Sequence, residues 1–176
     1  MANKLFKVHL LKEIVTSNSP EAFLLHDKSG FGEPVNDNEK IQYSLSEAMY
    51  LVEKGKIEVI QKNKKVPKKD LIKKFQRIDK KFQIKYLAYK DLRTKGYIVK
   101  TALKFGADFR VYPKGSRPGK GHAKWIVFVE HESKRFTWHE FSAKNRVAHS
   151  TKKNLLIAIV DEESDITYYE VSWIKP

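Results

Sequence analysis

The second half of the sequence alternates short runs of β-branched and aromatic residues with polar segments, and this pattern restricts the fold more than any other feature. Such runs are typical of β-strands. Five follow one another, at 97–99, 108–112, 125–130, 155–160 and 166–173. One helical stretch, 138–149, lies among them. Strands accompanied by few helices predict an α+β fold with a mixed sheet packed by helices, not a doubly wound fold.

The first half predicts a smaller α/β domain. We expect strands at 5–11, 22–26 and 57–60. Asn18, Ser19 and Pro20 form a turn between the first two. Ser44 and Glu47 have the spacing of a capping box, so a short helix begins there, and Gly55 ends it.

A basic amphipathic helix follows Pro67, a residue that the first turn of a helix tolerates. Its apolar positions recur every three or four residues, at Leu71, Phe75, Ile78 and Phe82. A further helix is expected at 84–95, with Gly96 as its stop signal. We place the boundary between the halves near residue 83, which gives an N-terminal domain 1–83 and a C-terminal domain 84–176.

Positive charge is concentrated in two clusters. The chain carries a formal net charge of +14, and the window 61–104 holds 16 Lys and Arg against three Asp. A second cluster lies within 110–125, where no acidic residue occurs. Two basic clusters in a chain of 176 residues indicate a polyanionic partner, RNA or DNA, although a solvated helix also explains the first cluster taken alone.

Composition excludes several classes of protein. The sequence has no cysteine, which removes disulfide scaffolds, thiolate zinc sites and cysteine nucleophiles, and suits a reducing cytoplasm. No run approaches the ~18 apolar residues of a membrane span, and the start lacks the apolar run of a signal peptide. We therefore expect a cytoplasmic protein with no membrane association. No His-Glu-x-x-His motif occurs, so no metal site is expected.

Three residues are candidates for chemistry. His122 follows a glycine-rich basic loop, 113–121, and precedes a strand, so its imidazole can exchange a proton with a ligand that the loop holds. Tyr112 ends a strand beside positive charge, which favours the phenolate. Lys153 opens the strand 155–160 and can be aimed at an anion. Taken singly, each also has a structural explanation, as a residue that merely begins or ends a strand.

Taken together, an ordered series of motifs resembles the catalytic domain of the archaeal tRNA-splicing endonuclease family. The series is the stretch 89–100, then 104–112, then Gly121-His122, then 147–156. The resemblance extends from about Tyr86 to Trp173. The segment 46–51 is similar to the family's smaller N-terminal domain, to a lesser degree.

The resemblance implies that Tyr112, His122 and Lys153 are the catalytic residues, with steps of 10 and 31 residues between them. Lys152 is adjacent, and Lys153 is chosen because it directly precedes Asn154. The implied substrate is precursor tRNA, cut at bulge-helix-bulge intron junctions by the ribose 2′-hydroxyl without metal or other cofactor. Arg146 and Trp173 match residues that hold a bulged base. The loop cations Lys114, Arg117 and Lys120 would bind RNA.

An acidic segment, 161–165, contrasts with the rest of this basic chain. Four carboxylates near an RNA site would repel the substrate, so we expect Glu162, Glu163 and Asp165 to meet a basic surface on another copy. The resemblance implies the same contact, and a homotetramer is the simplest assembly. A tetramer shared with non-catalytic subunits, or a merely solvated hairpin turn, remains open.

Two other classes of function also fit parts of the sequence. A non-catalytic protein that binds structured RNA would explain the charge and the aromatic residues, but not the spacing of the three candidates. A metal-dependent DNA nuclease would need clustered Asp or Glu, and the basic window supplies three scattered aspartates.

Overall fold

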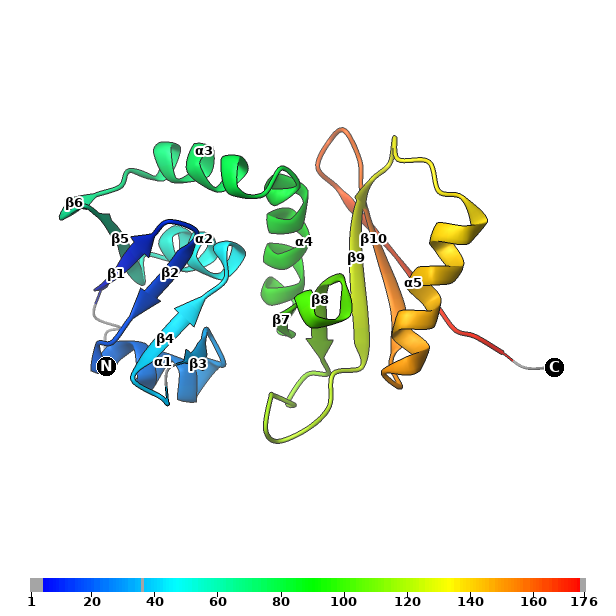
Figure 1. The fold of residues 1–176 in the computed structure, drawn as a ribbon, viewed down its shortest axis with the longest axis horizontal. Helices are drawn as coiled ribbons and strands as arrows, with labels where there is room; N and C mark the ends of the chain where they lie inside the picture. Colours follow the sequence, from blue (N-terminus) through cyan, green and yellow to red (C-terminus); the bar gives the residue numbers. More distant parts are fainter. Residues whose placement is uncertain (1–4, 36, 175–176) are drawn as a thin grey trace. The chain divides into compact units, whose positions relative to one another are not determined.

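The computed structural model describes residues 5–35 and 37–174. The chain divides into two compact units, 1–86 and 87–176. Each unit has its own sheet (Figure 1). The α+β fold class is confirmed.

The described part of the N-terminal unit contains a six-stranded mixed sheet with the order β3-β4-β2-β1-β5-β6. Its strands are β1 (Phe6–Leu11), β2 (Ile14–Ser17), β3 (Glu33–Val35), β4 (Lys40–Tyr43), β5 (Ile57–Gln61) and β6 (Lys64–Lys65). Its helices are α1 (Pro20–Ser29), α2 (Leu45–Glu53) and α3 (Lys68–Ile78). Residues from all three helices join the strands in one buried cluster, in which Val8, Met49 and Phe75 are fully enclosed.

The predicted strand at 22–26 is wrong, because this segment belongs to helix α1. Ser19 is the N-cap, its hydroxyl oxygen accepting from the amide of Ala22 at 3.3 Å, and Pro20 is the first helical residue. The residues expected to form a turn therefore begin a helix. Within α1, Ala22 and Leu25 are buried while Leu24 is 55% exposed, which is a helical and not an alternating pattern.

The capping box at Ser44 and Glu47 is confirmed at the start of α2. The basic helix is confirmed only as far as Ile78. Asp79 ends α3 in an extended conformation, and its carboxylate accepts from the amide of Lys81 at 2.9 Å. Phe82 is therefore not the last apolar position of α3 but the first residue of α4 (Phe82–Thr94).

The C-terminal unit contains, within its described residues, a five-stranded sheet with the order β11-β10-β9-β8-β7. Its strands are β7 (Ile98–Ala102), β8 (Ala107–Tyr112), β9 (Trp125–His131), β10 (Asn154–Val160) and β11 (Ile166–Val171). All five were expected from the sequence. A short 3-10 helix, η1 (Leu103–Phe105), lies between β7 and β8. Of the neighbouring pairs, β9 and β10 are parallel and the other three are antiparallel.

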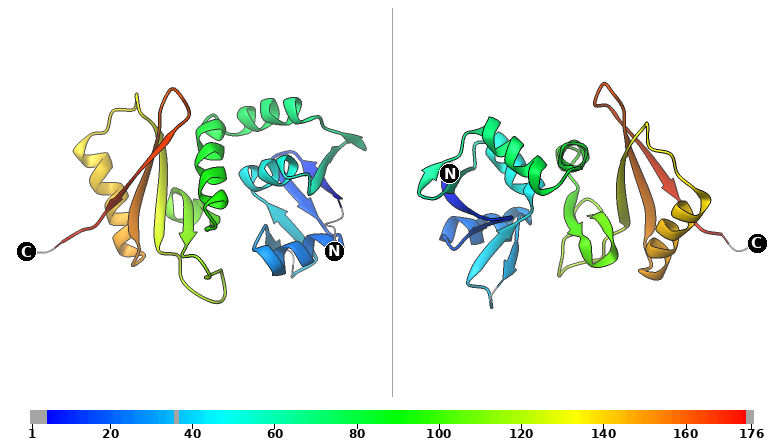
Figure 2. Two further views of the ribbon diagram at one scale, coloured as in Figure 1. Left: turned by 180° about the vertical axis from the view of Figure 1, so that it is seen from behind. Right: turned by 45° about the horizontal axis from the view of Figure 1, so that its top comes forward.

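Two helices cover the two faces of this sheet, as the views in Figures 1 and 2 show. On one face α5 (Trp138–Ser150) packs through Ala148, Phe141 and Val147 against residues of β9 and β10. On the other face lies the part of α4 after residue 86. The ring of Tyr89 lies 5.9 Å from that of Phe109, and the hydroxyl of Tyr168 donates to Asp91 at 2.8 Å. Burial and this bond raise the pKa of Tyr168.

Across the described residues, no helix is both long enough and apolar enough to span a bilayer.

Candidate active site

One edge of the C-terminal sheet brings together the end of β8 and the beginnings of β9 and β10. Val111 pairs with Trp125, and Trp125 pairs with Asn154. Two backbone hydrogen bonds extend this row. The amide of Lys124 donates to the carbonyl of Val111 at 2.9 Å, and the amide of Asn154 donates to the carbonyl of Lys124 at 3.0 Å. Since neighbouring strands lie about 5 Å apart, the row spans about 10 Å.

The three candidate catalytic residues flank this row. Tyr112 directly follows Val111, Lys153 directly precedes Asn154, and His122 lies two residues before Lys124. Side chains alternate along a strand, so Tyr112 is on the α5 face of the sheet, together with Ile126. Tyr112 is buried, His122 is exposed and Lys153 is half-buried. The topology thus brings residues that are up to 41 positions apart to one edge.

Both the backbone and the side chain of Lys153 form hydrogen bonds. Its amide donates to the carbonyl of Ala148 at the end of α5, at 2.9 Å. Its ammonium donates to the carbonyl of Thr151 at 2.7 Å and lies 5.9 Å from the ring centroid of Phe105. Lys152, in contrast, is exposed and has a left-handed backbone, with φ 54°. These differences support Lys153, and not Lys152, as the candidate catalytic cation.

Two further cations share the face of Tyr112. Lys100 in β7 pairs directly with Arg110 in β8, and Arg110 precedes Tyr112 by two residues. Residues two apart in a strand lie on the same face. Lys100 is 2% exposed, although a lysine is seldom fully buried. Lys100 was not among the residues predicted from the sequence, where its only signal is a lysine placed inside an apolar strand.

The loop between β8 and β9 begins with two consecutive β-turns, 113–116 and 117–120. In each turn the amide of the fourth residue donates to the carbonyl of the first at 3.0 Å. Gly115 and Gly119 occupy the third positions with φ of 82° and 80°. That conformation suits glycine, as in a type II turn. The loop therefore has a defined shape, and it carries Lys114, Arg117 and Lys120 on the way to His122.

Cations stack on aromatic rings where this loop joins the sheet. The ammonium of Lys114 lies 5.3 Å from the ring centroid of Tyr97, and that of Lys124 lies 4.4 Å from the ring of Trp125. The two rings meet edge to face, with centroids 5.6 Å apart. Such contacts anchor both ends of the loop.

Glu170 braces the same edge from β11. Its carboxylate accepts from the indole nitrogen of Trp125 at 3.0 Å and from the side-chain amide of Asn154. The ammonium of Lys124 lies 3.7 Å away. These hydrogen bonds, first that of Trp125, lower the pKa of the Glu170 carboxyl. Glu170 is not predictable from the sequence, because its role depends on the register of β11 against β10 and on no local motif.

Arg146 and Trp173, the residues expected to hold a bulged nucleotide base, lie near the end of α5. Arg146 is exposed, one helical turn before His149. Trp173 is 60% exposed, and its ring meets that of His149 edge to face at 4.2 Å. The structure thus places Trp173 beside the last turn of α5, which leads into Lys153.

The acidic turn, 161–165, lies at the opposite end of β10. The carboxylate of Asp161 accepts from the amides of Glu163 and Asp165 at 3.0 and 2.8 Å, so it closes the turn. The side chain of Glu162 is 80% exposed, and Glu163 and Asp165 are also exposed. The seven residues of β10 separate this turn from Lys153 by about 20 Å.

Among residues 5–35 and 37–174, no group of three or more His, Asp or Glu side chains is arranged to hold a metal ion. The candidate residues Tyr112, His122 and Lys153 supply a phenol, an imidazole and an ammonium, groups that can exchange protons and bind an anion.

Comparison with protein families gives two matches that together cover most of the chain. Residues 82–168 match the family model described as the tRNA intron endonuclease, catalytic C-terminal domain. Residues 6–72 match the tRNA intron endonuclease, N-terminal domain.

Similar proteins named tRNA-splicing endonuclease occur in several archaea. The one from Pyrococcus abyssi is 42% identical over 173 residues, which cover 98% of each chain. The one from Thermococcus onnurineus is 45% identical over 86% of this chain and 85% of its own. The one from Nanoarchaeum equitans is 47% identical over 83% of this chain and 97% of its own.

The Glu170 bonds predict a pH-dependent contribution to stability. Because the folded-state pKa lies below the ordinary value of about 4.3, the contribution is present above that value and is lost as the pH falls through the folded pKa. The side chain is more than a third exposed, so solvent screening limits the contribution to about 1 kcal/mol. Glu170→Gln should lower the free energy of unfolding by up to this amount at pH 7, measured by urea denaturation.

The difference in the free energy of unfolding between wild type and Glu170→Gln should shrink as the pH falls below about 4. The exposed Glu39→Gln is the matched control and should leave stability unchanged at every pH. A difference that stays constant down to the lowest pH at which both proteins fold contradicts the assigned bonds.

Proposed function

We propose that this chain, which belongs to the tRNA intron endonuclease family, cuts precursor tRNA at the bulges of a bulge-helix-bulge junction, without using a metal ion. Membership rests on both family matches and on relatives that cover nearly the whole chain, and it makes the protein an RNA endonuclease of tRNA splicing. The observation that carries the proposal is the hydrogen-bonded row from Val111 through Lys124 to Asn154, which gathers Tyr112, His122 and Lys153 at one edge.

The reaction is an attack of the ribose 2′-hydroxyl on the adjacent phosphorus. Tyr112 takes the proton of the 2′-hydroxyl as the new oxygen–phosphorus bond forms. His122 gives a proton to the 5′-oxygen as its bond to phosphorus breaks. Lys153 stabilises the negative charge that builds up on the crowded phosphorane. The products are a 2′,3′-cyclic phosphate and a 5′-hydroxyl end.

The cations on the face of Tyr112 support its role as the base. A phenol holds its proton at neutral pH unless its surroundings favour the anion. Lys100 lies opposite Arg110, and both are on the face of Tyr112, so positive charge is concentrated on the side where the phenolate would form.

RNA is held by a pair of flat side chains and by the loop cations. A guanidinium and an indole both stack on bases, and bases in RNA bulges are free to leave the helix. Arg146 and Trp173 both lie near the last turn of α5, and Trp173 keeps more than half of its surface exposed while it contacts His149. Lys114, Arg117 and Lys120 would contact phosphates beside the cut.

The assembly is proposed to be a homotetramer. The acidic turn lies about 20 Å along β10 from Lys153 and cannot complete the site of its own chain. Its exposed carboxylates are free to meet a basic surface of another copy, as opposite charges favour specific contacts. One chain carries both the site residues and the turn, so it needs no second kind of subunit.

Replacing the proposed general acid, His122, should slow RNA cleavage and leave RNA binding nearly unchanged. His122→Ala removes the proton donor for the leaving oxygen, so the single-turnover rate of cleavage should fall about 100-fold or more. RNA affinity should stay within about twofold, because His122 is one contact among many. His139→Ala, an exposed histidine on α5, is the control and should cleave like wild type.

Cleavage by the wild type should also continue in EDTA. A loss of cutting in EDTA that magnesium restores would contradict the metal-free mechanism, and unchanged rates in His122→Ala would remove this residue from it.

Reversing the charge of the acidic turn should dissociate the assembly. Glu162, Glu163 and Asp165 replaced by lysine would repel a basic surface, while the Asp161 bonds that close the turn remain. Light scattering should show half the mass of wild type, and circular dichroism should show an unchanged fold. Wild-type mass for this variant would mean that the segment is only a solvated turn.

A further inference from the structure

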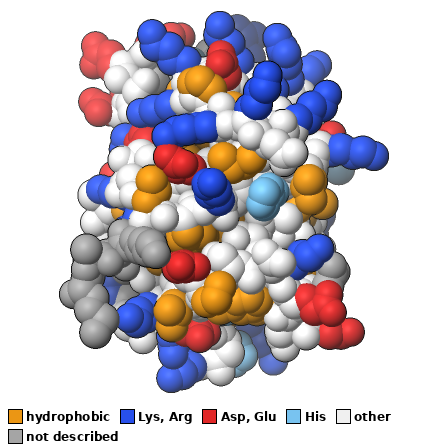
Figure 3. All heavy atoms as spheres, turned by 90° about the vertical axis from the view of Figure 1, so that its left-hand side faces the viewer, with side chains coloured by type: hydrophobic (Ala, Val, Ile, Leu, Met, Phe, Trp, Pro, Cys, Tyr) orange, Lys and Arg blue, Asp and Glu red, His pale blue; other side chains and the backbone are white. Residues whose placement is uncertain are grey.

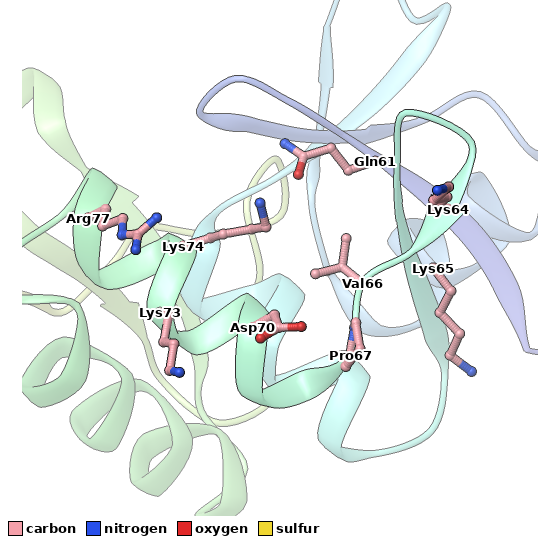
Figure 4. Close-up of a pocket in the computed structure, with 9 residues that line it drawn as sticks. All are labelled: Gln61, Lys64, Lys65, Val66, Pro67, Asp70, Lys73, Lys74 and Arg77. Atoms are coloured by element: carbon pink, nitrogen blue, oxygen red, sulfur yellow. The ribbon is translucent and has the colours of Figure 1, made fainter.

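A basic groove lies on the N-terminal unit, far in sequence from the candidate active site. It has a volume of about 500 Å³ and lies between α3 and the β5–β6 hairpin (Figure 4). Nine residues line it, of which five are Lys or Arg and one, Asp70, is acidic. We call it the α3 groove. In Figure 3, Lys and Arg side chains gather at the top of the view, the end at which Figure 1 draws α3 and β6.

Both walls of the α3 groove are firmly held. The β5–β6 hairpin has a two-residue turn, Lys62-Asn63, with φ of 49° and 61°, as a tight type I′ hairpin turn requires. The amide of Val66 then donates to the carbonyl of Val59 at 2.9 Å, directly before α3 begins. Opposite, Leu71 and Phe75 are fully buried and fasten α3 to the core. The groove is therefore shaped before any ligand binds, which reduces the entropy lost on binding.

Four of the five cations of the groove have no carboxylate partner among the described residues. Lys65 bonds to Glu58, and Figure 4 shows its ammonium directed away from the groove. Lys64, Lys73, Lys74 and Arg77, in contrast, form no ion pair in the described part of the chain. Figure 4 shows the ammonium of Lys73 directed away from the hairpin, which leaves Lys64, Lys74 and Arg77. Figure 4 shows Lys74 extending from α3 into the space between the helix and Gln61.

We infer that the α3 groove binds the sugar-phosphate backbone of the substrate RNA, outside the nucleotides that are cut. This inference rests on the proposed function. Unpaired cations gathered around a single lining carboxylate, Asp70, repel one another, and a polyanion relieves that repulsion. Lys74 and Arg77 lie three residues apart on α3, about 5 Å along its axis, and Lys64 lines the same groove from the hairpin. Point charges spread over two elements suit successive phosphates of a strand better than one small anion.

The α3 groove should therefore affect the affinity for RNA and not the rate of the cleavage step. It is built from residues 61–77 alone, whereas the proposed catalytic residues come from 112–153. Each phosphate contact that is lost reduces the slope of log affinity against log salt by about 0.7 to 0.9. Three lost contacts should thus lower the slope by about two to three.

A triple substitution with a charge-matched control tests this directly. Lys64, Lys74 and Arg77 are replaced by alanine in one variant, and Lys7, Lys28 and Lys54, exposed residues of the same unit, in the other. Binding of full-length precursor tRNA is measured at several salt concentrations. The groove variant should bind about tenfold or more weakly at 0.15 M salt, with the reduced slope, and its single-turnover rate at saturating enzyme should stay within twofold. The control variant should stay within about twofold of wild-type affinity.

Equal affinity and equal salt slope in the two variants would overturn the inference even if the wild type cleaves normally. If the wild type does not cleave precursor tRNA, the proposed function fails instead. If inorganic tripolyphosphate binds wild type and not the groove variant, while RNA binding is unchanged, the groove is a site for small anions and the inference is wrong.

The absence of cysteine allows a second test of contact. Lys74→Cys introduces the only thiol of the chain, to which a photo-crosslinker can be attached, and Lys28→Cys is the control. Crosslinks from position 74 should map to precursor tRNA nucleotides away from the two cut sites. If the crosslinker at position 74 captures no more RNA than the one at position 28, the proposed RNA-binding surface is wrong.

Discussion

The parallel pairing of β9 with β10 is the constraint on which the candidate site depends. Parallel strands begin at the same edge of a sheet, and the chain must cross over between them, here through α5. Because β8 is antiparallel to β9, its end lies at that same edge. The crossover and the double-turn loop therefore determine the steps of 10 and 31 residues between Tyr112, His122 and Lys153. The same pairing positions Lys124 and Asn154 for the brace supplied by Glu170.

The distribution of charge follows the same architecture. Cations cluster at the edge where β8 ends, on the loop that precedes β9, and along α3. The acidic turn lies at the far end of β10, about 20 Å from Lys153. Under the proposed function, this separation keeps the carboxylates away from the RNA and leaves them exposed for contact with another copy.

Much of this fold could be predicted from local pattern, because the strands of the C-terminal unit are short runs of β-branched and aromatic residues with clear turns between them. The helix at 22–26 could not be recognised from the sequence, because four consecutive apolar residues look like a strand. Only two of them, Ala22 and Leu25, are buried, and their spacing is helical. The spacing of Phe82 predicts the wrong helix for this residue, because it continues the apolar spacing of α3 across the break at Asp79. Lys100 and Glu170 could not be found, since their neighbours are set by strand register and lie far away in the sequence.

The most direct test of the metal-free mechanism replaces the ribose at the cut by deoxyribose. A precursor tRNA with a single 2′-deoxy nucleotide at each scissile position lacks the internal nucleophile, while its fold and phosphates are unchanged. The protein should bind this RNA and not cut it, and mass spectrometry of the all-ribose products should show 2′,3′-cyclic phosphate and 5′-hydroxyl ends. Cutting of the deoxy substrate to give 3′-hydroxyl and 5′-phosphate ends would contradict the metal-free mechanism.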